Sequence, residues 1–479
     1  MAPGSTVTNA EQKWTRVEHL TPAERAERGK AARNAVPRER IAEFEPAADR
    51  ADPIDLLEEQ AVTRVQELVP IRYGRMLVSP YAFFRGGALV MAADLATTPV
   101  SGLKVQACGD AHMSNFGVFA SPERNLVFDV NDFDETLPGP WEWDIKRLAA
   151  SLAIAGRDRG FTAKERAAIV EATAAGYRTE LRELAGMREL DVWYRRFDID
   201  AVMAATKALS RTTRQRGEAA VAKARTRDSL QAFSKLTHLV DGEPRIVSDP
   251  PLIVPIEELL PAAEVAAANE HLHEILVTYR RSLQTDRRHL LEQFRIVDVA
   301  RKVVGVGSVG TRAWIVLLLG RDGGDPLFLQ VKEAQPSVLA RFVGKSGFAN
   351  EGERVVAGQR IMQSVSDILL GWERIVSYED GKRRDFYIRQ LRDGKGAIDP
   401  DQIVPEGQVS YGRTCGQALA LAHARSGDRI AISSYLGKSA AFDHALAAFA
   451  ETYADQNQRD YEALRAAVDS GRVTAQVGL

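Results

Sequence analysis

The spacing of apolar residues divides the chain into helical and strand-like regions. From Leu56 to Leu68, and again from Ala82 to Leu95, apolar residues recur every three or four positions, which is typical of amphipathic helices. The second run follows Ser79-Pro80, a helix start signal. Helical spacing continues from Trp143 to about Ser234 and resumes between Glu257 and Phe294. Most of the chain before Arg295 is therefore predicted to be helical.

Two short strands are predicted inside this helical region. Leu103 to Cys108 leads into the polar segment GDAHMSNFG, and Asn125 to Val130 leads into NDFDE, with a turn at residues 121–124 between them. A separate hairpin is predicted at HLVDGEPRIV, where Asp-Gly supplies the turn. Each of the two apolar strands is thus followed directly by a cluster of polar residues.

Around Arg295 the pattern becomes strand-like. Three β-branched or apolar runs, RIVDVARKVVGVG, TRAWIVLLLG and PLFLQVKEA, are separated by glycine-rich turns. A helix from Asn350 to Gln363 and two further strands, ERIVSYE and RDFYIRQL, follow them. Five strands and one helix in about 100 residues predict a compact sheet unit. From Tyr411 to the end the pattern is helical again.

These regions predict an α+β protein with two lobes. Residues 1–50 are rich in Ala, Glu, Arg and Pro and are predicted to be a mobile N-terminal tail or frayed helix. Residues 51–294 are expected to form the first part of a helical lobe, and residues 295–395 a five-stranded sheet lobe. Residues 396–479 supply the remaining helices of the helical lobe.

Composition narrows the classes of protein to consider. The 479 residues are 45% hydrophobic and 27% charged, and 63 basic against 65 acidic residues leave a net charge of −2, so no overall field attracts nucleic acid or a membrane. Two cysteines fit a reducing compartment, and no apolar run is long enough for a membrane span or secretory signal. The basic stretch from Lys207 to Arg227 is interpreted as a solvated helix face, with an anionic acceptor or nucleic acid as alternatives. We expect a cytoplasmic protein without nucleic-acid or membrane partners; the oligomeric state stays open.

A glycine-rich segment lies between two predicted strands of the sheet lobe and contains Gly305, Gly307, Ser308 and Gly310. Glycines let backbone N–H groups approach phosphate oxygens because no Cβ stands in the way. A dinucleotide-binding loop would open a helix, so the strand–loop–strand context favours a flap over nucleotide phosphates. A plain glycine hairpin is the alternative interpretation.

Lys332 lies in the next strand, among alternating apolar residues. A buried ammonium group needs a fixed anion, such as nucleotide phosphates together with a carboxylate on a nearby helix. Glu351 and Glu353 begin the following helix and are the candidate partners. The alternative is a lysine on an edge strand that faces solvent.

The two polar segments that follow the short strands carry the residues that phosphoryl transfer needs. Asp110 can orient an acceptor hydroxyl, and Asn115 offers a neutral oxygen ligand for a hard cation. Asp132 offers an anionic ligand for Mg²⁺, and Asp129 or Asp134 could exchange roles with it. The alternative is that these residues only cap turns.

Together these segments resemble the protein-kinase-like phosphotransferase superfamily, most closely its small-molecule branch of aminoglycoside and choline kinases. The matching residues are Gly109, Asp110, His112 and Asn115 in the catalytic loop, Asp132 before Phe133, and Asp144, which opens a helix a dozen positions later. The resemblance implies ATP and Mg²⁺ as cofactors, Asp110 and His112 as catalytic residues, and a metal site at Asn115 and Asp132 with Asp134 beside it. It also implies that Lys332 binds phosphate with Glu351 as its helix partner, and that the glycine segment covers the nucleotide. Asp144 would brace the catalytic loop; the simpler interpretation of Asp144 is a carboxylate at the N-terminus of a helix.

The order of the motifs is unusual for that superfamily. The catalytic loop and metal aspartate precede the glycine flap by about 200 positions, which a circular permutation would explain. The segment LALAHAR near the C-terminus resembles the helix that normally leads into the catalytic loop, and Cys108 stands where the superfamily has a supporting histidine. Through SPYAFFRG, GDAHMSNFG, NDFDETLPGPWEWDIKRLAAS and VGVGSVGTR, the chain also resembles the bacterial domain-of-unknown-function family 2252 over nearly everything beyond residue 50.

The expected activity is ATP- and Mg²⁺-dependent phosphoryl transfer to a small hydroxyl-bearing metabolite. A small acceptor is favoured because Trp141 follows Asp132 by nine positions, which leaves no room for a protein-docking segment. The alternatives are a nucleotide-binding pseudokinase scaffold, a nucleotidyl transferase on the same fold, and a metal-dependent phosphoesterase. The phosphoesterase would need further histidine ligands, for which His271 and His273 have the spacing.

Overall fold

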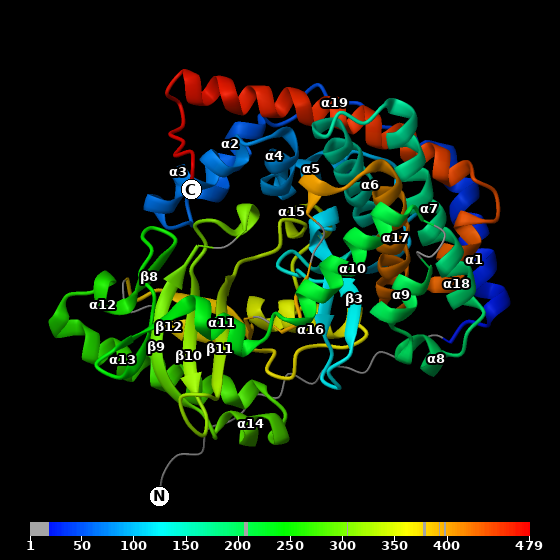
Figure 1. The fold of residues 1–479 in the computed structure, drawn as a ribbon. Helices are drawn as coiled ribbons and strands as arrows, with labels where there is room; N and C mark the ends of the chain where they lie inside the picture. Colours follow the sequence, from blue (N-terminus) through cyan, green and yellow to red (C-terminus); the bar gives the residue numbers. More distant parts are fainter. Residues whose placement is uncertain (1–18, 206–208, 304, 377–379, 392, 397–398) are drawn as a thin grey trace, which may run out of the picture.

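The structure is a computed structural model that describes residues 19–205, 209–303, 305–376, 380–391, 393–396 and 399–479 (Figure 1). It is an α+β protein in which a sheet with its own helices lies beside a larger helical body (Figure 1). Within the described residues, no helix is both long and apolar enough to cross a bilayer.

The principal sheet has six antiparallel strands in the order β12-β13-β11-β10-β9-β8. Its strands are β8 (Ile253–Pro255), β9 (Arg295–Lys302), β10 (Ala313–Leu319), β11 (Pro326–Ala334), β12 (Gly371–Val376) and β13 (Arg383–Gln390). The five predicted strands are present, but the prediction of a five-stranded sheet is wrong because β8 pairs with β9 as a sixth. A strand of three residues is too short to show a period in the sequence.

Both faces of this sheet are covered. Val316 and Leu318 pack with Tyr279 on one face, whereas Ile315 and Leu317 pack on the other face in the cluster that contains helix α11 (Ser229–Leu236). Burial on both faces explains why β10 and β11 are continuous apolar runs in the sequence. Helices α12 (Ile256–Leu259), α13 (Ala262–Tyr279), α14 (Thr285–Leu291), α15 (Ala340–Val343) and α16 (Glu351–Met362) belong to the same part of the chain.

The helical body joins segments from both ends of the chain. Its N-terminal helices are α2 (Pro53–Ala61), α3 (Val69–Met76), α4 (Pro80–Gly86), α5 (Ala88–Leu95), α6 (Trp141–Asp158), α7 (Ala163–Ala185), α8 (Glu189–Tyr194), α9 (Ile199–Ala205) and α10 (Arg211–Arg225). Its C-terminal helices are α17 (Pro405–Ser426), α18 (Arg429–Leu436) and α19 (Ala441–Asp469). Helix α17 packs against α7, and α19 packs against α6 and α7, so the residues before and after the sheet share one core.

Three small sheets complete the fold. β1 (Lys104–Ala107) pairs with β4 (Leu137–Pro140), β2 (Phe116–Ala120) pairs with β3 (Leu126–Val130), and β3 also pairs with the two-residue β5 (Phe197–Asp198). The predicted hairpin is β6 (Thr237–Val240) and β7 (Glu243–Ile246), and Asp241 and Gly242 take the positive φ values of 50° and 83° that its tight turn requires.

Residues 1–50 were expected to be a mobile tail or a frayed helix, and their described part contains a helix that packs on the helical body. Residues 1–18 lie outside the described part, but residues 22–35 form helix α1 (Pro22–Ala35), which packs on α18. Gly29 permits this contact, since an added Cβ would lie 2.0 Å from the carbonyl oxygen of Ala431. Arg25 Nε donates to Asp428 Oδ1 at 2.8 Å, and Ile41 is fully buried.

Candidate functional site

The loop after β1 is fixed from its N-terminal end. Gly109 has a φ of +81°, and an added Cβ there would lie 2.4 Å from the carbonyl oxygen of Glu135. Asp144, in the first turn of α6, accepts hydrogen bonds from the backbone N–H groups of Cys108 at 2.6 Å and Gly109 at 2.9 Å. Asp144 therefore braces the loop that carries Asp110.

The same carboxylate is held by a histidine from the other end of the chain. His423 Nε2 lies 3.1 Å from Asp144 Oδ2, and its Nδ1 lies 2.8 Å from the hydroxyl of Tyr177. An ionised carboxylate only accepts, so Nε2–H donates to Asp144 and Nδ1 accepts from Tyr177. His423 is fully buried in α17, within the segment LALAHAR. A histidine thus supports the loop that carries Asp110, although position 108 is cysteine.

Arg147 and Asn115 fix the orientation of Asp110. Arg147 Nε donates to Asp110 Oδ1 at 2.5 Å, and its guanidinium lies 4.3 Å above the ring of Phe84. The side-chain nitrogen of Asn115 donates to the backbone carbonyl of Asp110 at 2.7 Å, so its amide oxygen is the atom left for a cation. Arg147 follows Asp144 by three positions on α6 and therefore lies on the same helix face, which sequence reasoning missed.

His112 is a buried, uncharged neighbour of Asp110. Its Nε2 lies 3.8 Å from Asp110 Oδ2, and burial lowers the pKa of His112 to about 3. Its Nδ1 is buried without a hydrogen-bond partner among the described residues. At neutral pH His112 can therefore offer a hydrogen bond but no positive charge.

Lys332 of β11 meets the polar segment that follows β3. Its Nζ donates to Asp134 Oδ2 at 2.6 Å and lies 3.7 Å from Asp132 Oδ1. The hydroxyl of Tyr387, directly across from Lys332 in β13, donates to Asp134 Oδ1 at 2.5 Å. The structure therefore brings together Lys332, Asp132 and Asp134, which are far apart in the sequence, and Lys332 is buried rather than solvent-facing.

The electrostatics of this group follow from its burial. Burial alone would lower the pKa of Lys332, but Asp132 and Asp134 together raise it above its ordinary value. Burial would raise the pKa of Asp134, yet Lys332 and Tyr387 hold it well below the usual range. Burial, and then the charge of Asp134, raise the pKa of Asp132. Asp132 is thus the carboxylate whose charged form the protein stabilises less.

The glycine-rich segment forms a tight turn over the same cleft. Val306–Ser308 is a single turn of 3₁₀ helix, and Ser308 Oγ donates to Asp134 Oδ2 at 3.2 Å. Gly310 has a φ of +88°, which favours glycine. The backbone at Gly307 approaches Arg85 so closely that an added Cβ would lie 3.2 Å from its carbonyl oxygen. The segment therefore lies between β9 and helix α4.

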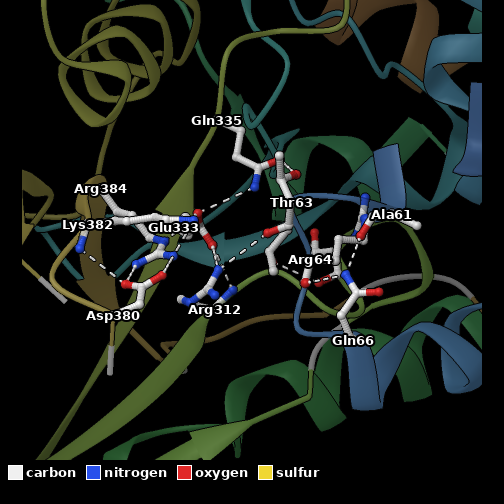
Figure 2. A network of polar contacts seen from close by, with 12 residues as sticks. Ala61, Thr63, Arg64, Gln66, Arg312, Glu333, Gln335, Asp380, Lys382 and Arg384 are labelled. Atoms are coloured by element: carbon white, nitrogen blue, oxygen red, sulfur yellow. Dashed lines mark hydrogen bonds and ion pairs between the residues drawn. The ribbon is translucent and has the colours of Figure 1, made fainter. Parts of the chain in front are cut away.

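An arginine before α3 clamps this segment. The buried Arg64 donates to the carbonyl oxygens of Val309 at 2.5 Å and Gly307 at 3.0 Å. Figure 2 shows Arg64 within a polar network in which Arg312 of the sheet side contacts Glu333 and the carbonyl oxygen of Thr63. The network ties the glycine segment to both the helical body and the sheet.

Glu351 is not brought to Lys332. Its carboxylate pairs with Arg354 at 2.5 Å, one turn along α16. Arg354 in turn donates to the carbonyl oxygens of Asp134 at 2.9 Å and Thr136 at 2.7 Å. Helix α16 therefore supports the Asp132–Asp134 segment through Arg354, while Lys332 takes its carboxylates from that segment itself.

Asp129 and the two spaced histidines lie away from the cleft. Asp129 Oδ2 accepts from the backbone N–H and hydroxyl of Ser364 at 3.2 and 3.3 Å, and burial raises the pKa of Asp129 to about 6. His271 lies on α13, where its Nε2 is 2.9 Å from the carbonyl oxygen of Val376. Neither Asp129 nor the His271–His273 pair lines the cleft of Lys332.

Nine of the predicted site residues line one cleft of about 290 Å³, whereas Gly310 and Glu351 are not part of its lining. The nine are Asp110, His112, Asn115, Asp132, Asp134, Gly305, Gly307, Ser308 and Lys332. Among the described residues no three His, Cys, Asp or Glu side chains are arranged to hold a metal by themselves. Mg²⁺ commonly uses one or two protein oxygens together with water and phosphate oxygens, and Asp132 with the Asn115 amide oxygen supplies such a pair.

A comparison with models of protein families gives one match. Residues 64–467 match the family described as "Uncharacterized protein conserved in bacteria (DUF2252)". The chain belongs to this family. Every residue of the cleft named above lies within the range that matches the DUF2252 family. No match was found among the curated proteins or the solved structures.

Two further charged residues, Arg85 and Glu135, line this DUF2252 cleft. Arg85, in the last turn of α4, lines the cleft, and its Nε is buried without a hydrogen-bond partner among the described residues. Glu135 follows Asp134, and burial raises the pKa of Glu135 to about 7. Arg85 lies within the segment SPYAFFRG and Glu135 is the last residue of NDFDE, so membership of a motif was the available signal.

Proposed function

We propose that this protein is a circularly permuted, protein-kinase-like phosphotransferase that uses ATP and Mg²⁺ and acts on a small hydroxyl-bearing metabolite. The observation that carries the proposal is the meeting of Lys332 with Asp132 at 3.7 Å and Asp134 at 2.6 Å beneath the glycine segment. A buried lysine that bridges two carboxylates can exchange one of them for phosphate oxygens.

The cleft residues divide into two groups by their chemistry. Lys332 and the backbone N–H groups of the glycine segment would bind phosphate oxygens, while Asp132 and the Asn115 amide oxygen would hold Mg²⁺. When bound, Mg²⁺ neutralises charge on the phosphates during transfer. Asp134 remains the ion-pair partner that keeps Lys332 positioned and charged.

Asp110 would act on the acceptor. Its carboxylate would accept the proton of the acceptor hydroxyl and orient the oxygen for attack, while the hydrogen bond from Arg147 holds the carboxylate in one orientation. His112 remains neutral at physiological pH, so it contributes a hydrogen bond rather than charge near the reacting group.

The contacts of His423 support the permutation. In the superfamily that the motifs resemble, the supporting histidine belongs to the catalytic loop and the preceding helix leads directly into it. Here α17 ends beside β1, since the backbone N–H of Gln106 donates to Ser426 Oγ at 3.2 Å, and His423 reaches Asp144 from that helix. Chain ends placed between α17 and β1 would give this arrangement.

The short connection after Asp132 supports a small acceptor. Residues 137–140 form β4 and pair with β1, and α6 begins at Trp141. The segment is therefore occupied by sheet pairing and offers no extended platform on which a polypeptide could dock.

Mass spectrometry tests this function. Full-length protein is incubated with ATP, Mg²⁺ and a metabolite extract, and products are sought at phosphate and AMP mass increments. We expect phosphate-mass products that depend on Asp110, so Asp110→Asn should lower turnover by about 100-fold or more. The control is Asp129→Asn. Asp129 lies in β3 and its carboxylate faces Ser364, so this variant should keep the activity of wild type.

The other outcomes select among the alternatives. AMP-mass products would replace phosphoryl transfer by nucleotidyl transfer. ATP binding without any product would favour a pseudokinase scaffold, and equal activity of the Asp110→Asn variant would contradict the assigned role of Asp110.

A further inference from the structure

A second cavity, of about 480 Å³, lies between α10, α11 and the loop that follows β13. Four cationic side chains line it: Lys223, Arg227, Lys235 and Lys395. Its remaining walls are Gln231, Gln330 and Leu391, so none of the described lining residues is acidic. Figure 1 shows α11 beside β11, where this cavity adjoins the sheet.

The lysines of this cavity differ from Arg225, which belongs to the same basic stretch. On the outer surface of α10, Arg225 pairs with Asp200 at 2.9 Å. Among the described residues, by contrast, the ammonium groups of Lys223, Lys235 and Lys395 have no hydrogen bond or ion pair. Like charges that face one cavity without a carboxylate repel each other, and an anion would relieve that repulsion.

The cavity wall is held by backbone hydrogen bonds. Arg227 donates from its guanidinium to the carbonyl oxygen of Lys395 at 2.9 Å, and its own carbonyl accepts from the N–H of Gly394 at 2.7 Å. The same loop pairs with β2, since Gly396 and Val118 exchange both backbone hydrogen bonds at 2.7 and 2.9 Å. Lys395 is therefore carried on a fixed loop rather than on a free chain.

The charge on Lys395 is poised to respond to an anion. Burial, and then the neighbouring charge of Arg389, lower the pKa of Lys395 to about 7. Asp367 and then Asp132 oppose this effect, while Lys332 adds to it. The carboxylate of Asp367 already accepts the backbone N–H groups of Leu369 and Gln390 at 2.8 and 2.5 Å. An anion bound in the cavity would raise the pKa of Lys395 and so favour its charged form, which can pair with that anion.

We propose that this cavity binds a small metabolite that carries several phosphate groups, at a site distinct from the Lys332 cleft. Its volume lies in the range of small-molecule pockets, and three lysines and one arginine match a cluster of negative charges. Gln330 lines both this cavity and the cleft, and Arg389 Nε donates to its side-chain oxygen at 3.1 Å. The binding itself does not depend on the proposed activity.

Tripolyphosphate tests the site directly. Calorimetric titration of the full chain at low salt should give binding that survives Lys332→Met, which removes the phosphate lysine of the other cleft. Lys395→Gln and the double variant Lys223→Gln/Lys235→Gln should each weaken binding about tenfold. Arg225→Gln removes one positive charge from the outer side of the same helix and should leave affinity within twofold. All three lysines lack side-chain partners among the described residues, so their replacement should spare folding.

Lysine acetylation read by mass spectrometry locates the ligand independently. Tripolyphosphate should protect Lys223, Lys235 and Lys395 from acetylation in wild type and in the Lys332→Met variant alike. Loss of all binding in Lys332→Met, or equal affinity in Lys395→Gln and wild type, would overturn the proposal. Tighter binding of single-stranded RNA that strengthens with its length would replace the small metabolite by nucleic acid.

Discussion

Replacing His423 by leucine should destabilise the protein and loosen the loop that carries Asp110. The substitution removes the donor to Asp144 Oδ2 at 3.1 Å and the acceptor of the Tyr177 hydroxyl at 2.8 Å. A hydrogen bond to a charged group contributes about 1.5–3 kcal/mol, and a buried hydroxyl left without a partner costs about 1–3 kcal/mol. The buried apolar surface of leucine offsets part of this loss of stability. We therefore expect His423→Leu to lower the free energy of unfolding by about 3 kcal/mol.

Two partial variants separate the contributions. His423→Gln keeps an N–H that can reach Asp144 and should lower the free energy of unfolding by about 1.5 kcal/mol. Tyr177→Phe keeps the contact between His423 and Asp144 and should lower it by about 1 kcal/mol. Urea unfolding with a shared slope gives the three differences.

Hydrogen exchange reports whether the loss of stability in His423→Leu extends to the loop that carries Asp110. The backbone N–H groups of Cys108 and Gly109 donate to Asp144, so a carboxylate freed from His423 should let both exchange faster in His423→Leu than in Tyr177→Phe. Equal destabilisation by leucine and glutamine, or unchanged exchange at the two amides, would refute the role of His423 as a brace.

Three further predictions concern the cleft. The pKa of His112 is about 3 in the folded protein and about 6.5 in the unfolded chain, so acidification between these values favours the unfolded state. Between pH 7.5 and 5 the free energy of unfolding of wild type should therefore fall by about 2 kcal/mol relative to that of His112→Asn. Arg85→Gln should weaken ATP binding about tenfold and ADP binding less than twofold by calorimetry, since Arg85 lies beside His112 and the glycine segment. Arg64→Met should speed hydrogen exchange across residues 305–310, as two carbonyl contacts are lost, whereas Arg225→Met should not.

Long periodic elements were predictable from the sequence because their pattern is local. The strands β9 to β13 and the capped start of α4 at Ser79 follow from spacing and turn residues within about ten positions. β2 was missed, since its five residues lack alternation and owe their extended form to pairing with β3 and with distant Gly396. The packing of α1 on α18 also depends on a partner about 400 positions away.

In the candidate site, too, residues in short motifs were predictable, whereas contacts between distant parts of the chain were not. Asp110, Asn115 and Asp132 stand in short motifs and line one cleft as the motif spacing implied. His423 lies in an apolar helix, and nothing near it in the sequence identifies Asp144 as its partner. Lys332 pairs with Asp134, and Glu351 with Arg354; the meeting of Lys332 with Asp134 is a contact across about 200 positions that no local pattern encodes.

The thermal shift with ATP and Mg²⁺ tests the central claim most directly, in wild type, Asp132→Asn and Asp129→Asn. Ligand at 100 times its Kd stabilises a protein by about 2.7 kcal/mol. Wild type and Asp129→Asn should show the same rise in Tm, because Asp129 faces Ser364, and Asp132→Asn should show little or none. Equal rises in all three proteins, or no rise in wild type, would contradict a nucleotide and metal site at Lys332 and Asp132.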